Sequence, residues 1–169
     1  MLPKLSERNA AFNTATRMEQ RVMIAQDVIE QLDAKEFLAR RGEYYYPVST
    51  DSYSKEKVAC SVCAIGALAV SVLDGEVNNL RADYTYQTGQ NLGTALSDYF
   101  DVYELRVIEA AFEGTPVRSE YDQDNGFHGD YLGSFLYGNA TENLRNIMEN
   151  IVNNGGNFVK EQMYTWRGR

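Results

Sequence analysis

The sequence predicts a mainly α-helical fold: a compact domain of four or five helices around a buried central helix, with short extended segments. Capping signals that precede apolar residues at helical spacing support this class, as does one long run that is apolar on every side. The 169 residues suit one domain, and a hydrophobic content of 44% is enough to form a core. We expect residues 1–169 to be a single domain, with residues 1–15 as a flexible arm.

The first helix is expected to begin after Thr16. The segment Thr16-Arg17-Met18-Glu19 has the form of a capping box, in which the threonine hydroxyl accepts from a first-turn amide and the glutamate reaches back. The helix is expected to end near Asp33–Lys35. Apolar residues then follow at the spacing of one helix face: Met18, Val22, Ala25, Val28, Ile29 and Leu32.

Residues 40–42 break this helical pattern, and strand-forming residues follow. Tyr44–Val48 is rich in tyrosine and is interrupted by Pro47, so we expect a short extended segment there. A second extended piece, Phe158–Val159, is a candidate to pair with it. Residues 49–57 are expected to form a polar loop.

The segment Cys60–Leu73 is apolar on every side, which is typical of a helix in the middle of a bundle. Its small residues, Ala64, Gly66, Ala67 and Ala69, would let neighbouring helices approach closely. A buried strand is the alternative, and the length and alanine content of the run favour the helix.

Two further helices are expected in the second half of the chain. One begins at the capping signal Asp101-x-x-Glu104 and runs to about Glu113, and the other begins near Thr141. The paired glycines of residues 153–156 would end the last helix. Residues 92–99 are expected to form a short helix, and residues 114–139 a long irregular loop.

The net charge of −8 argues against an electrostatic grip on nucleic acid or on an anionic membrane. Fourteen acids and four bases give residues 74–149 a net charge of −10, together with seven tyrosines, whereas residues 1–73 are neutral. Such asymmetry has two interpretations. The more common one is a solvated surface that keeps the protein soluble, and the other is an acidic binding face. No secretory signal and no apolar run of membrane-spanning length is present, so we expect a cytoplasmic protein.

The pair Cys60-x-x-Cys63 has three interpretations. It could be a redox pair, or half of a zinc site completed by His128 and one of Asp122, Asp124 and Asp130. The third interpretation, which we favour, is two small residues of a core helix. The acidic segment 120–133 fails as a calcium loop in either register, because glycine and glutamate are missing at the required positions.

Cys60-Ser61-Val62-Cys63-Ala64-Ile65-Gly66-Ala67-Leu68 resembles a C-x-x-C-A-x-G-A-L core found in a family of small phage and bacterial proteins with no established activity. Residues 21–29, residues 104–113 and the N-G-G-x-F segment at 154–158 resemble other parts of these proteins, so the resemblance covers about residues 17–160. It implies a phage setting, in which small acidic proteins often bind and inhibit host machinery, and hence the host cytoplasm.

We therefore expect a non-enzymatic acidic binding protein that engages and inhibits a basic host or defence protein, with nucleic-acid mimicry as one form of such binding. We expect no cofactor, no catalytic residues and no direct contact with nucleic acid or membrane. The alternatives are a small thiol-redox or metal-dependent enzyme using Cys60 and Cys63, and a small-molecule-sequestering protein. The expected partner-binding residues are Asp98, Asp101, Glu104, Glu109, Glu113, Glu120, Asp122, Asp124 and Asp130, with Tyr99, Tyr103 and Tyr121 as aromatic anchors.

Overall fold

The computed structural model describes residues 3–42, 45–47, 60–73, 96–122, 126–135 and 138–166, and only the backbone of 45–47, 116–122, 126–134 and 164–166. This part of the chain is mostly helical and compact, which confirms the predicted fold class. Its helices are α1 (Leu5–Arg8), η1 (Ala10–Thr14), α2 (Arg17–Asp33), α3 (Ala64–Val72), α5 (Val102–Glu113), α6 (Ala140–Asn153) and η3 (Lys160–Gln162).

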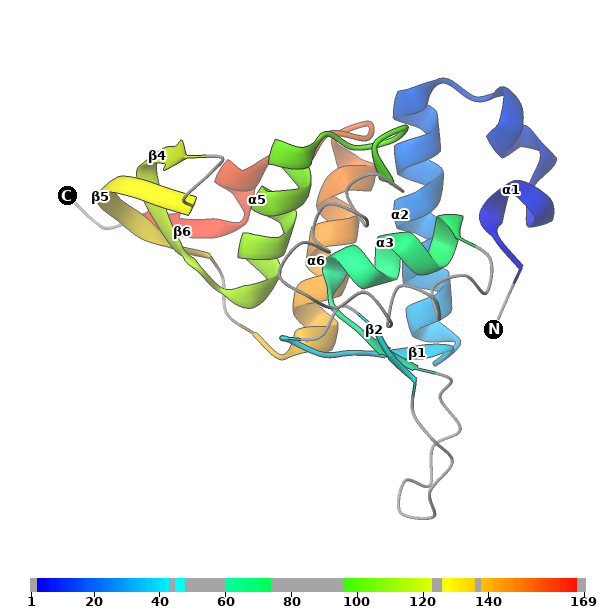
Figure 1. The fold of residues 1–169 in the computed structure, drawn as a ribbon, viewed down its shortest axis with the longest axis horizontal. Coiled ribbons are helices and arrows are strands. Elements are labelled where there is room, and N and C mark those ends of the chain that lie inside the picture. Colours follow the sequence, from blue (N-terminus) through cyan, green and yellow to red (C-terminus); the bar gives the residue numbers. More distant parts are fainter. Residues whose placement is uncertain are drawn as a thin grey trace, which may run out of the picture.

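The longer helices α2, α5 and α6 run roughly side by side, and α3 crosses them (Figure 1). One small sheet lies at the ends of α2 and α6, and a second lies beyond α5 at the opposite side from α1 (Figure 1). A single hydrophobic core joins these elements, and its largest fully buried side chains include Phe37, Phe100, Phe112, Leu68 and Ile147. In the part of the chain that the structure describes, no helix is both long enough and apolar enough to span a membrane.

The predicted capping box at the start of α2 is confirmed. The Thr16 hydroxyl accepts from the Glu19 amide at 3.4 Å, and the Glu19 carboxylate accepts from the Thr16 amide at 2.7 Å. Both bonds satisfy donors that a helix start leaves without an intrahelical partner. α2 then runs to Asp33, where the sequence places its end.

The expectation of a flexible arm at residues 1–15 does not fit the described part, residues 3–15. Leu5 and Phe12 are buried in the core, and Arg8 makes an ion pair with the buried Asp27 at 2.8 Å. The Asp27 carboxylate also accepts from Gln31 at 2.6 Å. Two apolar anchors and one buried ion pair therefore hold α1 and η1 against α2, and the polar composition of the segment conceals them.

The helix predicted over Cys60–Leu73 is wrong at its start. Cys60–Val62 is a strand, β3, and α3 begins only at Ala64, with Cys63 as its N-cap. β3 pairs in parallel with β1 (Phe37–Ala39) and antiparallel with β2 (Tyr45–Pro47), so three residues complete a sheet before the helix begins. The rest of the prediction holds, because every residue from Ala64 to Ser71 is buried.

The extended segment at Tyr44–Val48 is confirmed over the residues of β2, but its expected pairing with Phe158–Val159 is wrong. Phe158 and Val159 form no strand. Val159 instead exchanges two hydrogen bonds with the Asn150 side chain of α6, at 2.8 and 3.0 Å. The Asn150 side-chain amide thus bonds the Val159 N–H and C=O groups, which a neighbouring strand would otherwise have bonded.

Both of the later helices are confirmed. Asp101 caps α5 by accepting from the Glu104 amide at 2.7 Å, and Gly114 ends the helix in the left-handed conformation. α6 is capped by Asn139, two residues before Thr141, near which the sequence predicts its start. Only part of the predicted helix at residues 92–99 lies within the described residues.

The long irregular loop predicted at residues 114–139 is wrong. β4 (Pro116–Asp122) and β5 (Gly126–Phe135) form an antiparallel pair, and β6 (Tyr164–Trp166) adds to the other side of β5. The register shifts twice between Val117 and Glu120, which disturbs the alternation that would mark a strand. The sequence did contain a hairpin signal, since Asn125-Gly126 is a strongly favoured turn pair.

We predict that Gly156→Ala strongly destabilises the protein. Gly156 has φ of +97°, and an added Cβ would lie 2.6 Å from the Met18 carbonyl oxygen, so both the backbone and the neighbour would have to shift. The free energy of unfolding should fall by about 2 kcal/mol or more in urea denaturation. Gly155→Ala is the matched control, because its φ is +62° with nothing within 4 Å, and it should cost only about 1 kcal/mol. Equal losses in the two variants would contradict the close packing at Gly156.

We predict that Arg8→Met also destabilises the protein, because it leaves the buried Asp27 carboxylate without its cation. The expected loss is about 2–3 kcal/mol by urea denaturation. Lys4→Met breaks the exposed Lys4–Glu7 pair and should cost less than about 0.5 kcal/mol. Losses of the same small size would show that the N-terminal residues are not anchored through Asp27.

Candidate functional site

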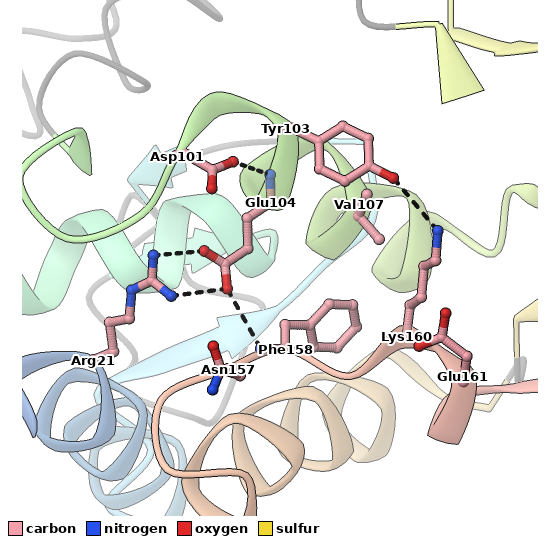
Figure 2. Close-up of a pocket in the computed structure, with 9 residues that line it drawn as sticks. All are labelled: Arg21, Asp101, Tyr103, Glu104, Val107, Asn157, Phe158, Lys160 and Glu161. Atoms are coloured by element: carbon pink, nitrogen blue, oxygen red, sulfur yellow. Dashed lines mark hydrogen bonds and ion pairs between the residues drawn. The ribbon is translucent and has the colours of Figure 1, made fainter. Parts of the chain in front are cut away.

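A pocket of about 300 Å³ lies between the first turns of α5 and the chain that follows α6 (Figure 2). Its walls come from three parts of the chain that are distant in the sequence: α2, the start of α5 and the segment 157–161. The lining combines aromatic rings with side chains of both charges. The residues are Arg21, Asp101, Tyr103, Glu104, Val107, Asn157, Phe158, Lys160 and Glu161.

Arg21 extends from α2 toward the back of the pocket. Its guanidinium contacts the Glu104 carboxylate at 2.7 and 3.1 Å, so the pair is bidentate. It also donates to the Tyr99 and Gly156 carbonyl oxygens and lies 4.9 Å from the centre of the Phe100 ring. A guanidinium with several donors in one plane suits this arrangement, because each of its three nitrogens has an acceptor although the side chain is only 8% exposed.

Glu104 stands at the inner end of the pocket, on the first turn of α5. Its carboxylate accepts from both the Arg21 guanidinium and the Phe158 amide, the latter at 3.4 Å. Burial raises the pKa of Glu104 above its ordinary value, and the nearby Arg21 charge acts in the opposite direction. Asp101, one turn away, raises the pKa further and fixes the helix start by accepting from the Glu104 amide.

The outer part of the pocket is formed by Tyr103 of α5 and by Lys160 and Glu161 of η3 (Figure 2). The Lys160 ammonium lies 3.4 Å from the Tyr103 hydroxyl oxygen and 6.0 Å from the centre of its ring. Phe158 is half-buried beside them, and Glu161 and Asp101 are exposed. The opening therefore presents two carboxylates and one ammonium around aromatic surface.

The hydrogen bonds of α6 hold the 157–162 segment in place. Asn150 binds Val159 in both directions, and its side-chain amide also donates to Gln162 at 3.1 Å. Gln162 exchanges further hydrogen bonds with Asn154 at 3.0 and 3.3 Å. These contacts place Phe158 and Lys160 against α5, so the protein's own hydrogen bonds hold this wall of the pocket.

Only some of the expected partner-binding residues meet at this pocket. Asp101, Tyr103 and Glu104 line it. Asp98 is exposed in the preceding turn, and the Tyr99 ring packs on Phe12 with ring centres 5.6 Å apart. Burial raises the pKa of Tyr99.

The other expected residues lie away from the pocket lining. Glu113, at the far end of α5, accepts from the Gly42 amide at 3.0 Å, and Glu109 is half-buried on the same helix. Glu120, Tyr121 and Asp122 are on β4 and Asp130 is on β5, where only the backbone is described. Asp124 lies outside the described residues.

Sequence reasoning missed most of the pocket. Arg21, Phe158, Lys160 and Glu161 were not among the expected residues, although all four line it. A signal existed for one contact, since the D-x-x-E pattern that caps α5 also places Glu104 on its first turn. Nothing in the spacing linked Glu104 to Arg21, which is 83 residues away.

The structure favours the core interpretation of the two cysteines. Both are free and buried, Cys60 in β3 and Cys63 at the start of α3. The Cys63 sulfur accepts from the Gly66 amide at 3.5 Å and so acts as a helix cap. Burial raises the pKa of Cys63 to about 12, which keeps the thiol protonated and weakens it as a nucleophile or metal ligand.

No group of three or more potential metal ligands is found among the described residues. The backbone register places His128 opposite Glu120 in the β4–β5 pair, whereas both cysteines belong to the β3–α3 segment. The zinc interpretation remains without support from the described part of the chain.

The chain matches no protein-family model, no curated protein and no solved structure. What the pocket can do therefore follows from its own geometry. It offers a recess with aromatic walls and more carboxylates than cations. Such a recess is suited to binding a cationic group.

We predict that ionisation of Cys63 lowers stability at alkaline pH. The pKa rises from 9.0 to about 12 on folding, so above pH 9 the unfolded thiol loses its proton while the folded thiol keeps it. This contribution is constant below pH 9 and is lost as the pH rises toward 12, by about 1.4 kcal/mol per pH unit. The free energy of unfolding, measured in urea between pH 8 and pH 10.5, should fall more steeply with pH for the natural protein than for Cys63→Ala. Parallel curves, or rapid reaction of Cys63 with a thiol reagent in the folded protein at pH 8, would contradict its burial.

Proposed function

We propose that this is a non-enzymatic binding protein whose acidic part engages a basic partner protein. The observation that carries the proposal is the segregation of charge, with −10 in residues 74–149 and a neutral segment before them. A surface of one sign steers a partner of the opposite sign and excludes partners of the same sign. It also gives an association that weakens with salt.

The structure supports this proposal at the start of α5. Asp98 and Asp101 are exposed there, next to Tyr103 and to Val102, an apolar side chain that is 55% exposed. Aromatic and apolar groups inside a charged rim are typical of the centre of a protein interface. Asp101 also caps α5, and that bond uses one of its carboxylate oxygens.

Several of the other acids have internal roles, which narrows the proposed contact surface. Glu104 is bound to Arg21, and Glu113 accepts from the backbone at Gly42. The Arg21 charge balances that of Glu104, and we do not count Glu104 and Glu113 among the direct contacts with a partner. We therefore assign the direct contacts to Asp98, to Asp101 and to the acids of the 120–130 segment.

The resemblance to small phage and bacterial proteins supports a more specific form of this proposal. A basic host or defence protein would be the partner, and binding would inhibit it, with nucleic-acid mimicry as one way to occupy a basic groove. The redox and metal alternatives have less support, because the Cys63 thiol is buried and its pKa is raised. The sequestration alternative expects residues 114–139 to close over a small molecule as an irregular segment, whereas their described part forms the β4–β5 pair.

The test compares capture of proteins from a host lysate by the immobilised natural chain and by a variant with Asp98→Asn, Glu120→Gln, Asp122→Asn and Asp130→Asn. These four changes remove negative charge and leave Asp101, Glu104 and Glu113, which bond within the protein, unchanged. We expect the natural chain to retain a basic protein that salt releases, and the variant to retain about tenfold less. Mass spectrometry identifies the protein, and calorimetry with the purified partner measures the affinity.

The matched control removes four acids from the neutral part of the chain, with Glu7→Gln, Glu30→Gln, Asp51→Asn and Glu56→Gln. It carries the same change in net charge and should retain the partner almost as well as the natural chain. Circular dichroism confirms that both variants are folded. Retention of no basic protein above background, or equal loss in the two variants, would overturn the proposal.

A further inference from the structure

We propose that the pocket at the start of α5 receives an arginine side chain of the basic partner. This inference rests on the proposed function and names the place where the partner's positive charge is recognised. Because Arg21 and Glu104 satisfy each other at the back of the pocket, that pair is close to neutral. The remaining charges at the opening are those of Asp101, Glu161 and Lys160, which leave an excess of one negative charge.

The wall of the pocket already holds a cation. The Lys160 ammonium lies 6.0 Å from the centre of the Tyr103 ring and 3.4 Å from its hydroxyl oxygen. An aromatic ring attracts a cation over its face, so this contact marks the ring as a place where positive charge is stable. Lys160 acts as an internal occupant that the partner's side chain would displace.

Withdrawal of Lys160 would leave its place beside the Tyr103 ring to the incoming cation. Lys160 is only half-buried, and its long flexible stem can move its ammonium into solvent. With Lys160 withdrawn, the lining keeps three carboxylates, those of Asp101, Glu104 and Glu161, against the single guanidinium of Arg21. The partner's charge then replaces the lost one, and the aromatic surface of Tyr103 and Phe158 covers its stem.

Arginine fits this pocket better than lysine. A guanidinium is planar, stacks on aromatic rings and is more weakly hydrated than an ammonium, so it loses less on leaving water. Its fork of donors suits carboxylate acceptors, and the lining supplies exposed carboxylates from two elements, Asp101 at the start of α5 and Glu161 of η3. The volume of about 300 Å³ is at the lower end of ligand pockets, which suits one side chain.

The test is a titration of the full-length protein, labelled with nitrogen-15, with a short peptide that contains one arginine among glycines and serines. The matched peptide has glutamine in place of the arginine. At low salt we expect the arginine peptide to shift the amide signals of Tyr103, Glu104, Phe158, Lys160 and Glu161, and the glutamine peptide to leave them unchanged. Equal shifts with both peptides would overturn the inference.

Two variants give opposite expectations. Lys160→Met removes the internal cation and should tighten binding of the arginine peptide about threefold or more, whereas Glu161→Gln should weaken it by a similar factor. Glu149→Gln, an exposed acid of α6, is the control and should leave the affinity unchanged. Unchanged or weaker binding by Lys160→Met would show that Lys160 is not a competitor and would overturn the inference. A lysine peptide that binds as tightly as the arginine peptide would overturn the preference for a guanidinium.

The outcome separates this inference from the proposed function. If the pocket variants have no effect on the peptide while the four-acid variant still loses the basic partner, the pocket inference fails and the proposed function stands. If neither set of variants changes binding, both fail. If the peptide binds as expected but no basic partner is retained, the pocket is a cation site and the protein-binding proposal fails.

Discussion

The position of α5 depends on one buried guanidinium. Arg21 extends from the second turn of α2 and meets a carboxylate, two backbone carbonyls and an aromatic ring at once. A buried cation costs free energy unless its donors are matched, so the chain has to bring all of these groups to one point. Glu104, the turn at Tyr99–Phe100 and the glycine pair after α6 are therefore placed by the same side chain.

This constraint also explains why the pocket exists. Because Glu104 turns inward to Arg21, the first turn of α5 does not present a full row of carboxylates to solvent. The chain after α6 must pass close to α2, and at Gly156 no side chain would fit beside the Met18 carbonyl. Phe158 and Lys160 consequently lie against α5 and leave a recess instead of a filled interface. Side chains needed for folding thus form the back of the pocket, and those at its opening lie where a partner could contact them.

Much of the helical part of the fold could be predicted from local sequence signals. The Thr16 and Asp101 caps and the glycines that end α5 and α6 involve groups a few residues apart, and their chemistry is visible in a short window. The β3 strand was missed because an apolar run of Cys60–Leu73 reads as one element until its partner β1 is known. The β4–β5 hairpin was missed because shifts in register remove the alternation on which strand prediction relies.

The candidate site was less predictable than the fold for a related reason. Acidic residues can be counted from the sequence, but whether a carboxylate faces solvent or pairs with a distant cation is a tertiary property. Glu104 and Glu113 look alike on the α5 sequence, yet one holds Arg21 and the other holds the backbone at Gly42. Lys160 shows the converse, since a single base in a short segment becomes part of an aromatic wall only when α6 turns the chain back.

The burial of α3 on every side has a consequence for how the molecule opens. A helix of nine residues is not stable alone. Every residue of α3 from Ala64 to Ser71 is buried, so the helix has no solvent-exposed side. Its backbone amides can reach water only when α2 and α5 separate from it, which dismantles the whole core. Hydrogen exchange at α3 should therefore report global unfolding, while the exposed turns around Asp98 and Asn157 can exchange through small local motions. The proposed recognition surface can thus open locally, whereas α3 opens only when the whole domain unfolds.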